Sequence, residues 1–317
     1  MVTPTMARIL TTHAGSLPRP KALVELLVRR SRGQDVDPSA FTAAVEDATR
    51  HVIARQLEVG IDVGNNGEQG RESFFTHVRH RLSGFAGESQ RPVMRDLIHY
   101  PGFVARKLPE FSRTMVSLMN APRAVGAVRY ADRGPLAEEC ATYWRLLEEH
   151  PAGFVESFLT APSPGIVACA MENAHYPDLA HYVAALADAL RWEYETIVAQ
   201  GFVLQIDAPD LAMERHTLFA DRPLDEFLAF VDLVVGALNQ ALGNVPRHRV
   251  RLHVCWGNYE GPHTFDVPLE EILPRLYQAR VGALMLPVAN PRHAHEHRCF
   301  ARHALPGDMQ LVRSEAH

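Results

Sequence analysis

VRLHVCWGNYEGP, residues 250–262, alternates apolar and polar residues up to His253 and Cys255 and then turns into a glycine-containing run. Alternation is typical of a β-strand, in which side chains two residues apart leave the same face. Glycine and proline after such a run indicate a loop. The stretch therefore predicts a short strand with an imidazole and a thiol on one face, directly before a loop.

An imidazole and a thiolate are common ligands of tetrahedral zinc, and a spacing of two residues lets one strand end supply both. The alternative interpretation is a buried cysteine beside a hydrogen-bonded histidine, without a metal. His253 and Cys255 are therefore candidate zinc ligands, and on spacing alone both interpretations stay open.

The composition is that of a globular protein and excludes several classes of partner. Of 317 residues, 47% are hydrophobic and 22% charged, and the net charge of −5 gives no basic surface for nucleic acid or an anionic membrane. The four cysteines are too scattered for a disulfide framework. The N-terminus lacks an apolar leader, and no apolar run reaches the roughly 18 residues of a membrane span. We expect a cytoplasmic protein with a small-molecule substrate.

Strands alternate with helices along the chain, and polar residues gather where the strands end. The expected strands are residues 8–12, 61–65, 125–130, 154–160, 202–207, 250–255, 283–289 and 309–312. The expected helices are residues 38–59, 136–150, 177–200, 223–242 and 268–279. This order predicts an α/β fold of the (β/α)8 TIM-barrel type, a single domain over residues 1–317 whose site is built by the loops after the strands. An open doubly wound sheet is the competitor, but the first strand lacks the Gly-x-Gly-x-x-Gly of dinucleotide binding.

Residues 72–120 are polar and interrupt this alternation, so we expect a lid-like excursion from the barrel. Arg71, Arg79 and Arg81 lie in or beside it. They can meet a polyanionic tail of a substrate or form a solvated face, and the solvated face is the expectation.

Five motifs occur in order between about residues 8 and 310: TTHAGSLPRP (11–20), NGEQGR (66–71), QIDAP (205–209), HVC (253–255) and NPRHAHE (290–296). Together they resemble the cobalamin-independent methionine synthase family, in particular shorter single-barrel relatives that are similar to the catalytic C-terminal half of the full enzyme. The resemblance implies a (β/α)8 barrel in which zinc binds a thiol substrate as the thiolate, and the sulfur attacks a methyl or alkyl carbon.

The resemblance also assigns roles to residues. Ser16, Glu68 and Asp207 fall where the family holds the amino-acid part of a homocysteine-like substrate, and His253 and Cys255 fall on its first two zinc ligands. Methyltetrahydrofolate enters as a methyl donor through the resemblance alone. The role of zinc is chemically consistent, because a free thiol with a pKa near 8.5 is mostly protonated at neutral pH and coordination deprotonates it. Without the resemblance, the alternative role of Asp207 is that of a helix N-cap, and the alternative role of Ser16 is that of a hydroxyl that stabilises a turn.

The sequence departs from the family at the metal site. Pro287 stands where the family has a glutamate ligand, and the family's last cysteine ligand, its acid/base histidine and its eighth strand fall beyond His317. We therefore expect half a zinc site, with Cys299 as a possible extra ligand. Further candidates in the neighbouring loops and tail are Glu260, His263, His293, His295 and His297. The alternative for the histidine-rich tail is a solvated segment, which is the favoured expectation.

A barrel without its last strand leaves an open flank, so we expect a homo-oligomer or a partner that covers it. Trp256 and Tyr259 can stack on a pterin or belong to the core, and we expect the core. Cys140 and Cys169 are expected to be ordinary buried thiols.

Methyl or alkyl transfer to a small thiol is the leading hypothesis for function. A metal-free barrel enzyme acting on a related amino acid or C–S compound, and a non-catalytic subunit that pairs with an intact homologue, are the alternatives.

Overall fold

The computed structural model describes residues 8–114, 121–257 and 261–314. Its main sheet has the strand order β1-β4-β5-β6-β7-β8, and each neighbouring pair is parallel. These strands are β1 (Val63–Gly64), β4 (Glu156–Pro162), β5 (Val203–Asp207), β6 (Val250–His253), β7 (Ala283–Leu286) and β8 (Gln310–Arg313). The expected first strand is reduced to a parallel bridge between Thr12 and Val63, which adds the N-terminal segment beside β1.

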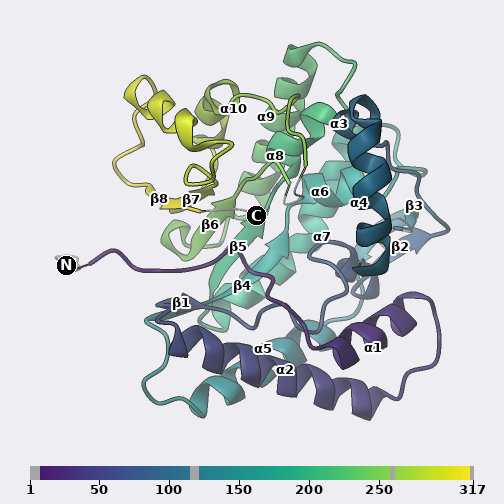
Figure 1. Cartoon of the computed structure of the whole chain (residues 1–317), viewed down its shortest axis with the longest axis vertical. Helices are drawn as coiled ribbons and strands as arrows, with labels where there is room; N and C mark the ends of the chain where they lie inside the picture. Colours follow the sequence, from purple (N-terminus) through teal and green to yellow (C-terminus); the bar gives the residue numbers. More distant parts are fainter. Residues whose placement is uncertain (1–7, 115–120, 258–260, 315–317) are drawn as a thin grey trace.

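The helices that follow the strands agree with the expected ones to within a few residues and cover the outer face of the sheet (Figure 1). They are α2 (Pro38–Glu58), α5 (Gly134–Glu148), α7 (Leu179–Ala199), α9 (Leu224–Ala241) and α10 (Leu269–Leu276). A further helix, α1 (Lys21–Ser31), packs on α2. The start of α2 is set by Asp37, whose carboxylate accepts a hydrogen bond from the Ser39 N–H (3.0 Å), and by Pro38 in the first turn. None of the described helices has the length and apolar character needed to cross a bilayer.

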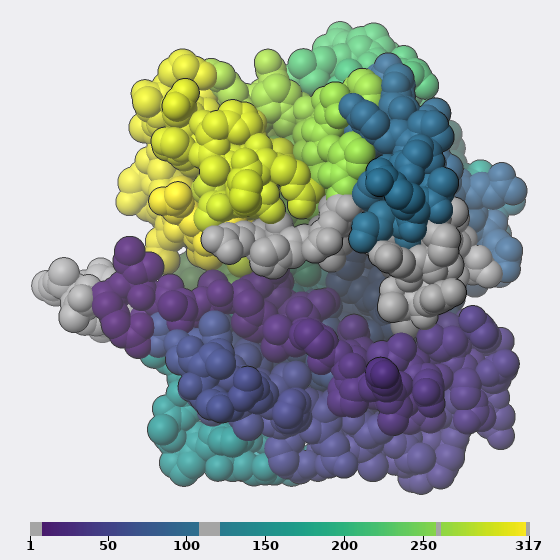
Figure 2. All heavy atoms as spheres, in the orientation of Figure 1, coloured from purple at the N-terminus to yellow at the C-terminus, as the bar shows by residue number. Residues whose placement is uncertain are grey.

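The sheet curls as a barrel does, yet in the described part of the chain β8 does not pair with the N-terminal segment. The α/β fold of TIM-barrel type, incomplete at the C-terminal strand, is therefore confirmed. Figure 2 shows the N-terminal segment in purple and the C-terminal residues in yellow on the same face of the molecule, with α4 (Pro101–Thr114) in blue beside them.

The segment between β1 and β4 forms a small second unit of structure. It contains η1 (Thr76–His80), α3 (Arg95–His99), α4, and the strands β2 (Leu82–Ala86) and β3 (Arg123–Tyr130). β2 and β3 pair antiparallel in a separate two-stranded sheet, so the strand expected near residues 125–130 lies outside the barrel. Phe75, Val78 and Leu82 are buried in the main hydrophobic core, which anchors the base of the excursion.

Alternation along the strands sorts side chains between the two faces of the sheet. In β5, Leu204 and Ile206 join the core under the helices, whereas Gln205 and Asp207 face inward. In β6, Leu252 packs outward in the same way, and Arg251 and His253 lie on the inner face, where they contact the β5 residues. The inner face at the carboxyl ends of the strands is therefore polar.

Candidate active site

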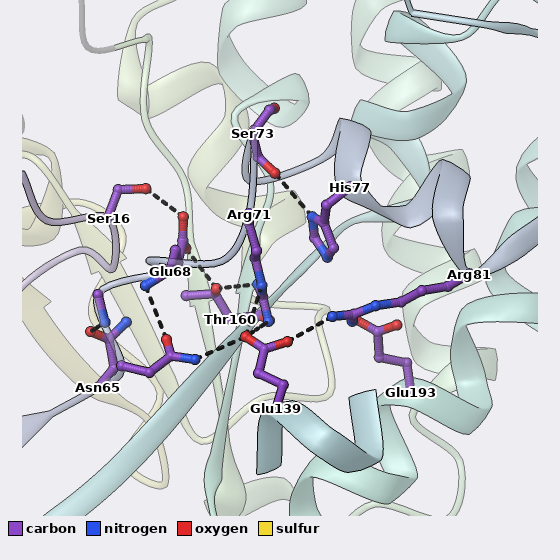
Figure 3. Close-up of polar contacts among 12 residues, drawn as sticks. Ser16, Asn65, Glu68, Arg71, Ser73, His77, Arg81, Glu139, Thr160 and Glu193 are labelled. Carbon is purple, nitrogen blue, oxygen red and sulfur yellow. Dashed lines mark hydrogen bonds and ion pairs between the residues drawn. The ribbon is translucent and has the colours of Figure 1, made fainter. Parts of the chain in front are cut away.

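Glu68 lies in the loop after β1 and is 1% exposed (Figure 3). The Ser16 hydroxyl donates a hydrogen bond to one carboxylate oxygen, and the Thr160 hydroxyl donates to the other (2.6 Å). The backbone of Glu68 has a φ of 55°, the left-handed value that non-glycine residues rarely adopt. The side-chain oxygen of Asn66 stabilises this turn by accepting a hydrogen bond from the Glu68 N–H (3.0 Å). A strained, buried carboxylate of this kind is typical of a functional loop.

Burial raises the pKa of Glu68, and nearby Asp207 raises it further, while Arg71 opposes both. The carboxylate of Asp207, at the end of β5, therefore lies close enough to Glu68, in the loop after β1, to raise its pKa. A cationic group bound between them relieves both the burial and the repulsion.

Arg71 and Arg81, beside this loop, are 3% and 5% exposed. The expectation that these arginines form a solvated face was therefore wrong for both. Arg71 donates to the Thr160 carbonyl oxygen (2.9 Å) and to Glu139 (3.0 Å); Arg81 donates to Glu139 (2.6 Å) and Glu193 (2.9 Å) (Figure 3). Burial opposes ionisation of Glu139, but the two guanidinium groups outweigh it and lower its pKa to about 2. The glutamates on α5 and α7 explain why these arginines fold inward.

Arg79, in contrast, remains partly exposed and pairs with Glu72 (3.3 Å).

Asp207 and His253 face each other across β5 and β6. His253 Nδ1 lies 2.9 Å from Asp207 Oδ1, which also accepts a hydrogen bond from Gln205 Nε2 (2.7 Å). The N-cap of the following helix α8 (Asp210–Met213) is Pro209, without a side-chain cap, so Asp207 does not serve as its cap. A carboxylate on one ring nitrogen fixes the imidazole and leaves Nε2 for a ligand, as second-shell carboxylates do at metal sites.

His253 Nε2 is buried without a hydrogen-bond partner in the structure. Burial opposes protonation of the ring, but Cys255, two residues further on, and Asp207 outweigh it and raise the His253 pKa to about 10. Cys255 is 8% exposed and lies close enough to the ring to raise its pKa. Imidazole and thiol therefore lie together at the strand end and fit two positions of a zinc site.

The described residues supply no third ligand beside this pair. His253 pairs with Met285 across β6 and β7, so Cys255 and Pro287 follow at equivalent positions, and proline cannot coordinate a metal. Two groups of three metal-ligating side chains occur among the described residues, and neither contains His253 or Cys255. Cys299 lies in the hydrophobic core, where burial raises its pKa, and Glu260 falls outside the described residues.

Trp256 is 1% exposed and donates from Nε1 to the Val267 carbonyl oxygen (2.8 Å), which confirms its place in the core. It stacks on His293, with ring centroids 4.1 Å apart. His293 is 8% exposed, so at this residue the expectation of a solvated tail was wrong; the ring is drawn inward by Asp266 and Glu296. His295 and His297 are exposed, and Tyr259 falls outside the described residues.

All four cysteines are free and buried, Cys140 and Cys169 among them as expected.

The sequence reasoning missed Thr160 and Arg251. Thr160 touches both Glu68 and Arg71, and Arg251 donates to Gln205 Oε1 (2.7 Å) while its guanidinium lies 3.7 Å from the centroid of the Phe158 ring. The alternation of the strands could have indicated both residues. Arg251 stands two residues before His253 on β6, and Thr160 stands two residues after Phe158 on β4, so each shares the inward face of its strand.

Comparison with known proteins shows which proteins the chain is similar to. No family model matches the sequence. The methionine synthase of Sulfolobus acidocaldarius is 26% identical over 83% of this chain and 66% of its own length, and that of Pyrococcus abyssi is 27% identical over 78% and 62%. The chain is a homologue of these archaeal methionine synthases. The matches span less than two thirds of the length of these relatives.

Solved structures support the fold of this family. The structure of a B12-independent methionine synthase from Shewanella sp. W3-18-1 in complex with selenomethionine matches 96% of this chain and 89% of its own, with a TM-score of 0.65 at 18% identity. A putative B12-independent methionine synthase from Listeria monocytogenes matches 98% and 92%, with a TM-score of 0.61 at 14% identity. The open barrel is thus superimposable on methionine-synthase barrels over nearly its whole length.

Proposed function

We propose that the chain is a methyl- or alkyltransferase of the methionine-synthase type, whose acceptor is a small amino-acid thiol such as homocysteine. One observation carries the proposal: Asp207 joins two half-sites. It holds the His253 ring, beside Cys255, and its charge raises the pKa of buried Glu68. The names of the relatives, methionine synthase, agree with this chemistry.

The carboxylates bind the amino group of the acceptor in this proposal. Glu68 and Asp207 share a buried position in which an ammonium ion offsets their mutual repulsion. Ser16 and Thr160 orient Glu68 through their hydroxyls, and Arg71 holds the Thr160 side chain and backbone. These contacts fix the amino acid so that its sulfur points toward the end of β6.

His253 and Cys255 are the residues that would hold zinc. When bound there, zinc supplies a Lewis acid that lowers the pKa of a thiol into the neutral range. Asp207 fixes the His253 tautomer, and the buried surroundings of both donors exclude water from the sulfur nucleophile. Methyltetrahydrofolate as donor belongs to the proposal through the family alone.

The test is methionine formation by the purified chain from homocysteine and methyltetrahydrofolate, before and after chelation and zinc return. We expect activity that chelation removes, and a loss of at least about 1,000-fold in His253→Ala, because metal Lewis-acid assistance supplies several kcal/mol. Arg55→Met, an exposed helix position, serves as the control. Absence of methyl transfer from the zinc-loaded chain would contradict the proposal.

One observation favours a second candidate, a metal-free enzyme acting on a related amino acid or C–S compound. Pro287 occupies the position beside Cys255 where a third ligand is expected, and the described residues offer no substitute. This candidate keeps Glu68 and Asp207 as binding groups and predicts full activity after chelation, so the same experiment separates the two.

The excursion between β1 and β4 is proposed as a lid over the site. Two contacts support this: Asp96 on α3 accepts from the Thr264 N–H (3.0 Å), and the Tyr100 hydroxyl lies 2.9 Å from Thr264 Oγ1 in the loop after β6. We also infer a cytoplasmic protein, supported by four free cysteines. The edge of β8 is the proposed place for a second subunit.

A further inference from the structure

Five metal-ligating side chains, none of them His253 or Cys255, form two overlapping groups that share Asp266. They are Asp96 on α3, His216 on η2 (Glu214–His216), His263 and Asp266 after β6, and His293 after β7. The ligand atoms of His263, Asp266 and His293 lie within 4.8 Å of one another, and so do those of Asp96, His216 and Asp266. We propose that this cluster, here called the Asp266 cluster, is a binding site for a divalent transition-metal ion.

The geometry around Asp266 is that of ligands arranged about a common point. Its Oδ2 atom lies 3.0 Å from His263 Nδ1 and 3.0 Å from His293 Nε2, and its Oδ1 atom lies 4.0 Å from His216 Nδ1. Ligand bonds of 2.0–2.1 Å place neighbouring ligand atoms about 2.9–3.4 Å apart in tetrahedral or octahedral coordination. The His293 contact has this distance without the direction of a hydrogen bond.

Unpartnered buried nitrogens give independent support. His216 is fully buried and its Nε2 atom lacks a hydrogen-bond partner, whereas His293, 8% exposed, places Nε2 3.0 Å from Asp266 Oδ2 as an ion pair without hydrogen-bond geometry. Buried polar atoms of this kind are rare in proteins and require an explanation. A metal ion at the cluster accounts for His293 Nε2, which faces Asp266 directly.

The surroundings of His293 have the form of a supported metal ligand. Its Nδ1 atom lies 2.7 Å from Glu296 Oε2, and the other oxygen of Glu296 accepts a hydrogen bond from the Leu269 N–H (2.6 Å). Trp256 stacks on the ring and fixes its plane. A carboxylate behind the distal nitrogen and a packed ring together direct Nε2 toward the ion, as at other histidine metal sites.

The ligand chemistry selects the class of ion. Two imidazoles and a carboxylate, His263, His293 and Asp266, suit Zn²⁺, Co²⁺, Mn²⁺ or Fe²⁺ and leave coordination positions open. Asp96 and His216 lie on the far side of Asp266, where they can complete the shell or orient its Oδ1 atom. The inference does not depend on methyl transfer, because the cluster contains no sulfur and no residue of the Glu68–Asp207 site.

Cobalt binding to the full chain tests the proposal. The metal-stripped protein and its Cys255→Ser variant are reloaded with Co²⁺, dialysed and measured for cobalt per chain, thermal midpoint and absorption. We expect Cys255→Ser to keep about one ion without a thiolate-to-cobalt band, and to gain thermal stability on loading, because an ion that binds only the native state stabilises it. Removing His293 as well, in Cys255→Ser/His293→Ala, is expected to abolish that ion and that gain.

Two further variants control the result. His295→Ala removes an exposed neighbour of His293 and is expected to retain the ion. Glu296→Gln keeps the size of the supporting side chain and is expected to weaken cobalt binding by about 10–100-fold, the range for loss of a second-shell partner. Thermal midpoints in chelator show whether each variant folds. An ion absent from Cys255→Ser, or retained when His293 is removed, would overturn the proposal.

Discussion

Two polar regions at the carboxyl ends of the strands are built in opposite ways. Around Glu68, buried carboxylates meet buried guanidinium groups: Glu139 lies between Arg71 and Arg81. Around Asp266, the partners are imidazoles, and two ring nitrogens remain without a hydrogen bond. The ion pairs of the first region therefore use guanidinium groups, which stay charged, whereas those of the second use imidazoles, which can exchange a proton for a metal ion.

The difference indicates a division of labour. A completed ion-pair network holds the Glu68 loop in one geometry and leaves Glu68 and Asp207 to select a cationic amino group. Histidines and carboxylates without a fixed cation are suited to exchangeable metal ions, because imidazole can bind either a proton or a metal. His253 ends β6 and contacts Asp207, and Cys255 follows two residues later.

The largest effect is expected from breaking the complete region. Arg81→Met leaves the fully buried Glu193 without a guanidinium partner and leaves Glu139 with Arg71 alone. Loss of one partner from a buried ion pair costs about 3–5 kcal/mol of unfolding free energy. Urea unfolding measures it, with Arg55→Met on the surface of α2 as a control expected to change by less than about 1 kcal/mol. Equal effects of the two substitutions would contradict the description of a buried network.

Asp210, a carboxylate beside Ser163, sharpens the comparison: burial raises its pKa to about 7, whereas two guanidinium groups outweigh burial at Glu139 and lower its pKa. Its folded pKa exceeds the unfolded value near 3.9, so its contribution to stability is present below about pH 4 and declines until about pH 7. That decline is worth up to about 4 kcal/mol. We expect Asp210→Asn to remove it from the dependence of unfolding free energy on pH. An unchanged profile would contradict the buried, uncompensated carboxylate.

Glu68→Gln tests whether the completed region binds substrate or only orders a loop. The amide retains an oxygen that accepts from Thr160 or Ser16 but loses the charge, so the KM for homocysteine is expected to rise about 10–100-fold, as for loss of a charged hydrogen bond of about 1.5–3 kcal/mol. Steady-state kinetics measures it beside Glu58→Gln, an exposed change on α2. A large loss of stability with KM unchanged would assign Glu68 to loop order alone.

The smallest expected effect is a gain. Pro287→Glu places a carboxylate beside Cys255, and we expect zinc to bind about tenfold or more tightly, since catalytic zinc normally has three protein ligands. Competition against a chelating dye measures the affinity. The gain is expected to vanish when Cys255→Ser is combined with it; persistence there would show that the new glutamate binds zinc elsewhere.

Much of the fold followed from local patterns. Strands β4 to β8 and helices α2, α5, α7, α9 and α10 agree with the periodicity because their apolar stripes pack on one another. Residues 72–130 were harder, since Phe75 and Val78 join the core through contacts far apart in sequence.

The sequence predicted those site residues that come from one strand end. It did not predict those that come together from several separate loops and helices. His253 and Cys255 stand two residues apart, so the end of β6 at His253 brings both to one place although the strand stops before Cys255. Arg81, in contrast, is buried only because Glu139 and Glu193 arrive from two later helices. Asp96 and His216 likewise come from elements far apart in the sequence, so no spacing of residues predicts their contact.

Proton release on thiol binding tests the central claim most directly. Calorimetric titration of the zinc-loaded chain with homocysteine, in buffers of different ionisation enthalpy near pH 7, counts the protons released per molecule bound. We predict about one proton for the native chain and none for Cys255→Ser, because a thiol must lose its proton to bind as thiolate. Binding without proton release, or equal release by both proteins, would contradict a site that prepares a thiol for alkylation.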